Sequence, residues 1–257
     1  SKLEEAELSY KQAILLNDNF AEAHYNLGFT LEELGRLEEA EGSYNQAIAL
    51  KADYAAAHYN LGNELKKMGR LDEAAASYNR AIASKPNFAK AHCSLANTLI
   101  DLERLEEAIA SYLEAIRLKP DFAEAYVNLG LSLRYTRFKV SNRKLYPPLS
   151  HLLTIGNFIR PGYLAGCIVS LLKHDPLLKD LLIKKNNVKN LTDATSIIVN
   201  LDKLPLLHQL MRICPLPDLE LEGFFVKMRR FLLVNLYGVK ESPETVFFLS
   251  TLALQCF

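Results

Sequence analysis

Apolar residues in the first half of the chain recur with the spacing of an amphipathic helix. In residues 37–50, for example, Ala40 and Tyr44 lie four positions apart, with polar or small residues between them. Such spacing places apolar side chains on one face of a helix. The same arrangement returns in residues 71–84 and 105–118, so the pattern predicts a succession of helices that pack through one face.

The apolar pattern belongs to a longer repeat. FAEAHYNLG (20–28), YAAAHYNLG (54–62), FAKAHCSLA (88–96) and FAEAYVNLG (122–130) each start 34 residues after the last. Between them run GRLEEAEGSYNQAIAL (35–50), GRLDEAAASYNRAIAS (69–84) and ERLEEAIASYLEAIRL (103–118), and KLEEAELSYKQAILL (2–16) is a leading copy. Each repeat is therefore predicted to be a pair of helices.

Small and large residues alternate between the two helices of a pair in the way that close packing requires. The first helix carries a small residue and the second an alanine where the two should approach closely, and a large residue fills the space beside each. The small positions are Gly28, Gly62, Ala96 and Gly130 with Ala40, Ala74 and Ala108; the large ones are Leu27, Leu61, Leu95 and Leu129 with Tyr10, Tyr44, Tyr78 and Tyr112. Pro86 and Pro120 should end the second helices.

These motifs resemble the tetratricopeptide repeat family, whose period is 34 residues. The resemblance covers residues 1–135, with three full repeats at 19–52, 53–86 and 87–120 and a half repeat at each end. It implies a superhelical solenoid whose concave wall binds an extended peptide or a partner protein. The NLG-type repeats are also similar to those of O-linked N-acetylglucosamine transferases.

Residues beside the packing positions should line the concave wall. By spacing, these are Tyr25, Asn26, Phe29, Glu33, Tyr59, Asn60, Asn63, Lys67, Ser94, Asn97, Asp101, Asn128 and Tyr135. Asn26, Asn60 and Asn128 recur at one repeat position, and a row of amides can satisfy the backbone of a peptide irrespective of its sequence. The alternative is that asparagine is simply a soluble consensus residue. The Lys and Asn set with which some repeats of this family capture a C-terminal carboxylate is not reproduced.

The repeat pattern fails after Leu133, so residues 136–257 should form a second, helical domain. Helix starts are predicted at Pro176, Thr192, Pro205, Asp218 and Ser242. The strongest helix, 219–236, places Leu221, Phe224, Phe225, Met228, Phe231, Leu232 and Asn235 on one side. The expected fold is all-α, a superhelical solenoid followed by a small helical bundle.

Residues 146–257 resemble the segment between the repeats and the catalytic domain of bacterial tetratricopeptide-linked methyltransferases that use S-adenosylmethionine. The motifs are Cys214-Pro215-Leu216-Pro217-Asp218 and Gln255-Cys256-Phe257. The apolar stretch 244–257 is then expected to pack against a part of the protein beyond Phe257. An alternative function follows: a substrate-recruiting part of a methyltransferase or, as a weaker reading, of a glycosyltransferase. The glycine-rich loop for the cofactor is not among these residues.

Charge is divided unevenly although the total is zero. Residues 1–135 hold 14 Lys and Arg against 21 Asp and Glu, and residues 136–257 hold 16 against 9. The basic stretch 134–148 interleaves aromatics with Arg and Lys, but a single short stretch is more typical of a linker than of a nucleic-acid surface. No stretch is long and apolar enough to suggest a membrane span. The cysteines Cys93, Cys167, Cys214 and Cys256 form no CxxC pair, which disfavours zinc sites and disulfides and favours the cytoplasm.

Histidines offer little chemistry. His24, His58 and His92 recur once per repeat, about 10 Å apart, which is too far for a shared metal ion and favours helix contacts. His151, His174 and His208 lack the spacing of a nucleophile set. We therefore expect no catalysis, metal or cofactor in these residues. Separately, the first helix has no partner on its outer side, so we expect self-association through this uncapped end of the solenoid.

Overall fold

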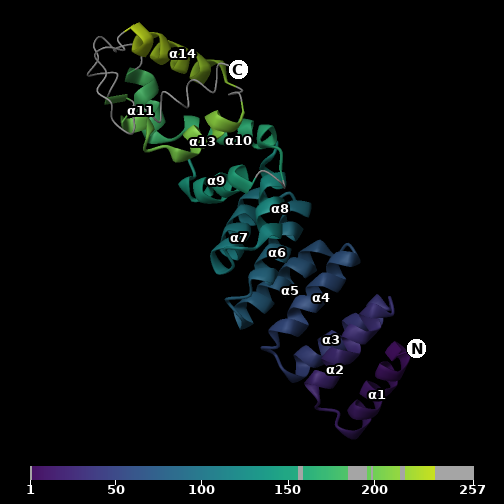
Figure 1. Ribbon diagram of the computed structural model, residues 1–257. Coiled ribbons are helices and arrows are strands. Elements are labelled where there is room, and N and C mark those ends of the chain that lie inside the picture. Colours follow the sequence, from purple (N-terminus) through teal and green to yellow (C-terminus); the bar gives the residue numbers. More distant parts are fainter. Residues whose placement is uncertain (1, 156–158, 185–195, 198, 215–217, 235–257) are drawn as a thin grey trace. The chain divides into compact units, whose positions relative to one another are not determined.

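The computed structural model describes residues 2–155, 159–184, 196–197, 199–214 and 218–234 (Figure 1). Every regular element among these residues is a helix, so the predicted all-α repeat fold is confirmed. The chain divides into two compact units, residues 1–125 and 126–257, each of which is described by itself. The domain boundary expected after residue 135 stays a prediction.

The first unit is a stack of antiparallel helix pairs. Its A-helices pack against the B-helices that follow them, α2 against α3, α4 against α5 and α6 against α7, and α1 packs on α2. The A-helices are α2 (Ala21–Glu33), α4 (Ala55–Lys67) and α6 (Ala89–Asp101); the B-helices are α1 (Lys2–Leu16), α3 (Leu37–Leu50), α5 (Leu71–Ser84) and α7 (Leu105–Leu118). The B-helices α5 and α7 end two residues before Pro86 and Pro120, as expected from proline.

Each A-helix ends in a left-handed residue that turns the chain toward its B-helix. Gly35 has a φ of 73° and Gly69 a φ of 76°, a conformation that glycine adopts without a steric penalty. The third turn has Glu103 in this position, with a φ of 60°. Backbone bonds close the turn in the same way each time; Arg36 N, for example, donates to Leu31 O.

The small positions do bring paired helices together. A methyl group added to Gly28 would lie 2.8 Å from the Tyr44 ring, and one added to Gly62 would lie 2.7 Å from the Tyr78 ring. Both rings are fully buried. The glycines are therefore required where a large B-helix side chain lies flat on the A-helix.

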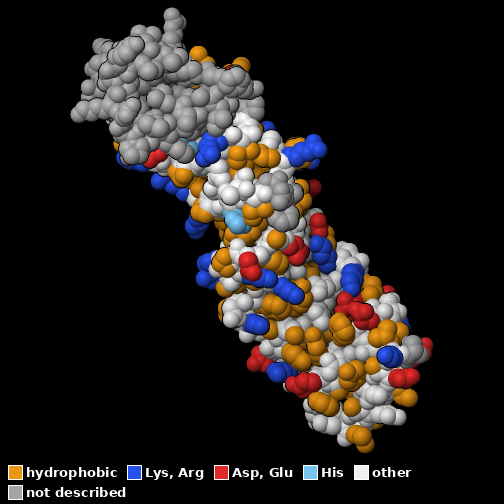
Figure 2. Space-filling model, in the orientation of Figure 1, with side chains coloured by type: hydrophobic (Ala, Val, Ile, Leu, Met, Phe, Trp, Pro, Cys, Tyr) orange, Lys and Arg blue, Asp and Glu red, His pale blue; other side chains and the backbone are white. Residues whose placement is uncertain are grey.

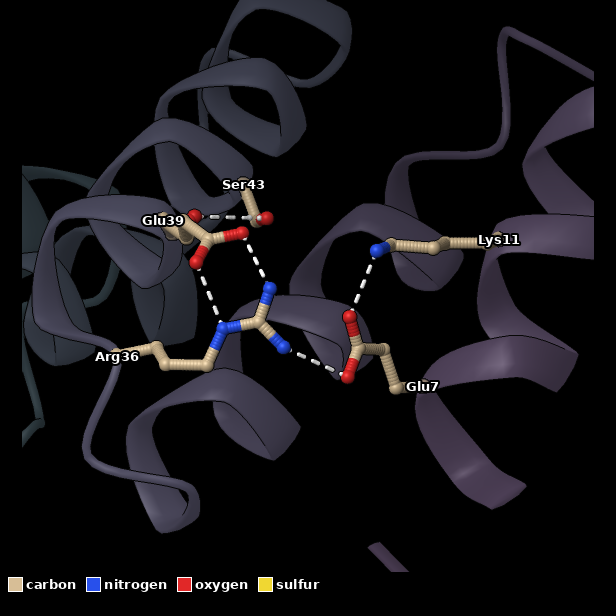
Figure 3. Close-up of polar contacts among 5 residues, drawn as sticks. All are labelled: Glu7, Lys11, Arg36, Glu39 and Ser43. Carbon is tan, nitrogen blue, oxygen red and sulfur yellow. Dashed lines mark hydrogen bonds and ion pairs between the residues drawn. The ribbon is translucent and has the colours of Figure 1, made fainter. Parts of the chain in front are cut away.

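An arginine precedes each of α3, α5 and α7, and the first two of these arginines link successive repeats. Arg36 is bidentate to Glu39 in its own helix and donates to Glu7 of α1 at 2.8 Å, while Lys11 holds the other oxygen of Glu7 (Figure 3). Arg70 repeats the arrangement, with Glu73 in its own helix and Glu41 of α3. Arg104 pairs with Glu107, but Ala75 stands where the earlier repeats have a glutamate.

Hydrophobic side chains of α1 stay in contact with solvent. Leu15 is 85% and Leu16 89% exposed, and hydrophobic side chains reach the surface at this end of the unit (Figure 2). Self-association through this helix stays a prediction.

Most described helices of the second unit are shorter than those of the first, although α14 is not. The helices are α8 (Ala123–Leu133), which begins at the unit boundary, the 3-10 helix η1 (Arg143–Leu145), α9 (Tyr146–Ile155), α10 (Pro161–Lys173), α11 (Pro176–Lys184), α13 (Pro205–Ile213) and α14 (Leu219–Val234). The predicted starts at Pro176, Pro205 and Asp218 are confirmed, and Asp218 caps α14 by accepting from Leu221 N at 3.0 Å. The starts at Thr192 and Ser242 and the stretch 244–257 lie outside the described residues.

The described core of this unit is mainly apolar, but it also buries His208 and one carboxylate. Asp175 is fully buried, and it accepts from Arg143 through both oxygens, from the Tyr146 hydroxyl at 2.7 Å and from Leu177 N at 2.9 Å. On α14, Leu221, Phe224 and Phe225 are buried, as predicted; the side chains of residues 227–234 are outside the described part. Leu152 of α9 and Ile159 lie against Gly130, where a B-helix would otherwise pack.

Candidate functional site

The A-helices form one continuous wall of the first unit. Helix α2 contacts α4 and α4 contacts α6, whereas successive B-helices approach one another less closely. Because the A-helices are the closer set, the stack curves toward them, and their outward side is the concave one. We call the surface formed by α2, α4 and α6 the A-helix wall.

A cavity of about 420 Å³ opens in this wall. Its lining comes from all three A-helices and from α5 behind them: Glu32, Asn63, Lys66, Lys67, Tyr78, Ser94 and Asn97. Six of these seven side chains belong to the A-helices, so the cavity crosses successive repeats.

Buried tyrosines of the B-helices fix the amides of the wall. The Tyr78 hydroxyl donates to Asn63 Oδ1 at 2.8 Å, and the Tyr112 hydroxyl donates to Asn97 Oδ1 at 2.6 Å. Burial raises the pKa of Tyr78, so that its hydroxyl stays a neutral donor. Each bond assigns the amide oxygen to the tyrosine and turns the amide nitrogen away from it.

The first repeat uses the same tyrosine differently. Phe29 occupies the position of Asn63, and the Tyr44 hydroxyl donates instead to Glu32 Oε2 at 3.0 Å. The change of one A-helix residue thus redirects the B-helix hydroxyl to a carboxylate.

Glu32 belongs to a charged cluster that joins two repeats. Lys67 Nζ lies 2.7 Å from Glu32 Oε1 and 2.7 Å from Glu64 Oε1, and Glu64 has no solvent exposure. Burial, together with the charge of Glu32, raises the pKa of Glu64. Burial acts in the same direction on Glu32, but hydrogen bonds from Lys67 and Tyr44 outweigh it and lower the pKa of Glu32. The pKa values of the two carboxyl groups are therefore shifted in opposite directions, and Glu32 gives up its proton more readily than Glu64.

The neighbouring lysine is also paired. Lys66 Nζ lies 2.9 Å from Asp101 Oδ2, an ion pair between α4 and α6. Both ammonium groups that line the cavity are therefore held by carboxylates.

The row of Asn26, Asn60, Ser94 and Asn128 was expected to bind a peptide backbone. Its two central residues, Asn60 and Ser94, instead bond to tyrosines of the preceding repeat. Asn60 Nδ2 lies 3.2 Å from the Tyr25 hydroxyl and 3.4 Å from the Tyr44 hydroxyl, and Ser94 Oγ lies 3.5 Å from the Tyr59 hydroxyl. The rings of Tyr25 and Tyr59 in turn lie 5.0 Å from those of Tyr54 and Phe88 in the next repeat. These bonds occupy donors that a peptide would need, and a peptide role for this row stays a prediction.

The other predicted residues divide into two sets. Asn63, Lys67, Ser94 and Asn97 come together at the cavity, and Asp101 reaches it through Lys66. Phe29 and Glu33 are exposed on α2, and Asn26 is half-buried there; Asn128 and Tyr135 lie in the second unit.

Three residues of the cavity were not predicted: Glu32, Lys66 and Tyr78. Glu32 and Lys66 occupy one repeat position, and the charge at that position was a usable signal. Tyr78 was assigned to packing, which it also performs.

The histidines take part in packing. His58 Nε2 lies 2.9 Å from Ala52 O, and His92 Nε2 lies 3.3 Å from Pro86 O. In the second unit the His151 ring packs against Tyr126 with centroids 4.3 Å apart, and burial lowers the pKa of His208. Within the described ranges, no three His, Cys, Asp or Glu side chains gather as a metal site would require. Among the helices that the structure places, none has both the length and the apolarity needed to span a bilayer.

The repeats are similar to those of several proteins of known structure. No curated protein matches the chain. Among similar solved structures, MamA has 28% identity and a TM-score of 0.49 over 51% of this chain and 76% of its own. The first TPR of Spaghetti (RPAP3), bound to an HSP90 peptide, has 21% identity and a TM-score of 0.43 over 44% of this chain and 89% of its own. An O-GlcNAc transferase of Thermobaculum terrenum has 23% identity and a TM-score of 0.45 over 52% of this chain and 26% of its own. A methyltransferase relation is not shown for residues 146–257.

The family match rests on the repeats themselves. A model described as TPR repeat matches residues 1–35, 32–69, 62–102 and 96–133, which together cover 133 of the 257 residues. Its segments fall on the helix pairs described above, including the half repeat α1. The chain therefore belongs to the tetratricopeptide repeat family.

Proposed function

We propose that the chain is a protein-interaction module whose A-helix wall binds an extended polypeptide segment. The observation that carries the proposal is the cavity, because its lining comes from three successive A-helices. Packed helices lie about 8–10 Å apart, so three of them span roughly 20 Å. An extended chain advances about 3.3 Å per residue, so about six residues would cross the wall.

The amides of Asn63 and Asn97 suit a peptide backbone. Their oxygens accept from Tyr78 and Tyr112, so the groups of these side chains that can donate to a bound chain are the amide nitrogens, each of which carries two hydrogens. Peptide carbonyls are the acceptors that every extended segment offers at regular intervals. The Ser94 hydroxyl, which also lines the cavity, can donate or accept. Recognition of this kind depends on the backbone, and pockets for side chains supply the selectivity.

A peptide screen with a matched control tests this proposal. The full chain is compared on an array of random ten-residue peptides with the double variant Asn63→Ala/Asn97→Ala and with the control Asn45→Ala/Asn79→Ala. Asn45 and Asn79 are exposed on the B-helices α3 and α5 and do not line the cavity.

We expect the wall variant to bind its peptides roughly 10- to 100-fold more weakly, because two hydrogen bonds of about 1 kcal/mol each are lost. The control should bind like the unaltered chain, and circular dichroism should show all three proteins folded. Equal binding by the wall variant and the control would refute the proposal, as would the absence of any bound peptide.

A further inference from the structure

We propose that the segment bound by the A-helix wall places a lysine or arginine side chain, and not a carboxylate, at the cavity. This inference rests on the proposed function and concerns which peptides the same site selects. It is argued from the charges around the cavity, all of which lie in the first unit.

The two lysines that line the cavity are already matched by carboxylates. Lys67 lies between Glu32 and Glu64, and Lys66 pairs with Asp101. Three carboxyl groups thus face two ammonium groups. Each lysine that lines the cavity already has a carboxylate within 3 Å, so the cavity itself offers an incoming anion no unmatched lysine; Lys90, at the other end of α6, does not line the cavity.

An acidic ligand would have to displace one of these carboxylates. Competition for Lys67 would leave Glu64, whose side chain has no solvent exposure, without its cation. A buried carboxyl group that loses its hydrogen-bond partner is costly whether or not it is ionised. Competition for Lys66 would free Asp101 into direct repulsion with the new carboxylate.

A cationic ligand meets the opposite conditions. Asp101 uses only Oδ2 for Lys66, and 46% of its side chain is exposed. Glu33 is exposed on the same wall, and its side chain makes no hydrogen bond or ion pair with the described residues. Each has an oxygen available to a lysine or arginine side chain.

Helix ends favour the same charge. Glu33 and Asp101 are the last residues of α2 and α6, and Lys67 is the last residue of α4. The C-terminal end of a helix carries a partial negative charge that attracts cations within about one turn. Three such ends lie in one row along the wall, so backbone and side chains act together.

The wider charge of the repeats has the same sign. Residues 1–135 hold 21 Asp and Glu against 14 Lys and Arg. An excess of this kind raises the association rate of basic segments and lowers that of acidic ones, and the effect weakens with salt.

Peptide pools with blocked ends test the inference. Ten-residue pools, acetylated and amidated, carry uncharged random residues around one fixed central residue, which is Lys, Arg, norleucine or Glu. Binding to the full chain is measured by fluorescence anisotropy at 50 and 300 mM salt. A carboxylate variant of the wall, Glu33→Gln/Asp101→Asn, is compared with a matched control, Asp72→Asn/Glu106→Gln. The two control residues are exposed at the starts of α5 and α7.

We expect the Lys and Arg pools to bind roughly three- to tenfold more tightly than the norleucine pool at low salt, and the Glu pool to bind most weakly. In the carboxylate variant, the affinity for the Lys pool should fall to within about twofold of the affinity for the norleucine pool. The control should keep its preference for the Lys and Arg pools. Equal binding of all pools, or tightest binding of the Glu pool, would overturn the inference while leaving peptide binding intact. Failure of every pool to bind would overturn both.

Discussion

The contact between Gly62 and Tyr78 makes the packing of a repeat measurable. In Gly62→Ala the new methyl carbon would lie 2.7 Å, 2.8 Å and 3.0 Å from three carbons of the Tyr78 ring. The ring cannot easily move, because it is 1% exposed and its hydroxyl is bonded to Asn63. Overpacking of this kind costs about 1–3 kcal/mol. The gain of helix propensity on replacing glycine by alanine offsets about 0.5–1 kcal/mol of that cost.

Gly42→Ala is the matched control. Gly42 also lies inside a helix, α3, but a methyl group there would meet nothing within 4 Å. It should stabilise the protein by about 0.5–1 kcal/mol through propensity alone. The two variants share their chemistry, so the difference between them, about 1–3 kcal/mol, isolates the clash with the ring.

Urea unfolding followed by circular dichroism gives the stability of each variant, and hydrogen exchange of α4 and α5 shows whether the change is local. The third repeat bears on the size of the effect, because it has Ala96 at this position beside the buried Tyr112. A helix pair can therefore be built around a methyl group when its ring is set accordingly, which favours the lower end of the range. If Gly62→Ala were as stable as Gly42→Ala, the reasoning from close approach would be refuted.

Three further changes have defined outcomes. Glu103→Gly should stabilise the protein by about 1 kcal/mol in urea unfolding, because Glu103 holds the left-handed turn that Gly35 and Gly69 hold elsewhere; a loss of stability would contradict this. Asp175→Asn should destabilise the second unit by about 1–3 kcal/mol at pH 7, because the bidentate bond from Arg143 is lost. Burial favours the neutral form of Asp175, but the bonds from Arg143 and Tyr146 outweigh burial and lower the pKa of this group. The stability that the ionised carboxylate provides is therefore present above its usual pKa of 3.8 and is lost as the pH falls through the lowered pKa. The difference in stability between the unaltered chain and the Asn variant should accordingly become smaller in acid. Burial raises the pKa of Glu64 above its usual value of 4.5, so the ionisation of this group opposes folding as the pH rises from 4.5 through the raised pKa. Glu64→Gln should therefore gain stability relative to the unaltered chain as the pH rises from about 4 to about 7.5. A relative loss of stability over that interval would contradict the raised pKa.

The repeat unit was predictable because the same packing residues recur in its sequence every 34 residues. A glycine and a tyrosine that recur together at 34-residue intervals identify the two faces that meet, and Gly28–Tyr44 and Gly62–Tyr78 meet as expected. The second unit has no such internal copy. Its central charge cluster joins Arg143 to Asp175 across 32 residues, and no local pattern indicates that pairing.

The candidate site was predictable only in part, for a geometric reason. Periodicity shows that Asn60 and Asn63 both lie near the outward side of α4, but the two positions differ in which neighbour they meet. Asn60 meets Tyr25 of the preceding repeat, whereas Asn63 meets Tyr78 of its own. Only the relative placement of three helices decides which amide bridges repeats and which lines the cavity.

Comparison of the repeats with one another separates the residues that build the fold from those that can select a ligand. The B-helix tyrosine is the same in all three full repeats, and each copy is fully buried. Three positions of the wall vary: Phe29, Asn63 and Asn97; Glu32, Lys66 and Ile100; and Glu33, Lys67 and Asp101. Because the buried tyrosine is constant, these substitutions change the surface around the same ring, as the redirected hydroxyl of Tyr44 illustrates. Selectivity for a partner should therefore be altered most effectively by exchanging wall residues between repeats, which leaves the buried tyrosines in place.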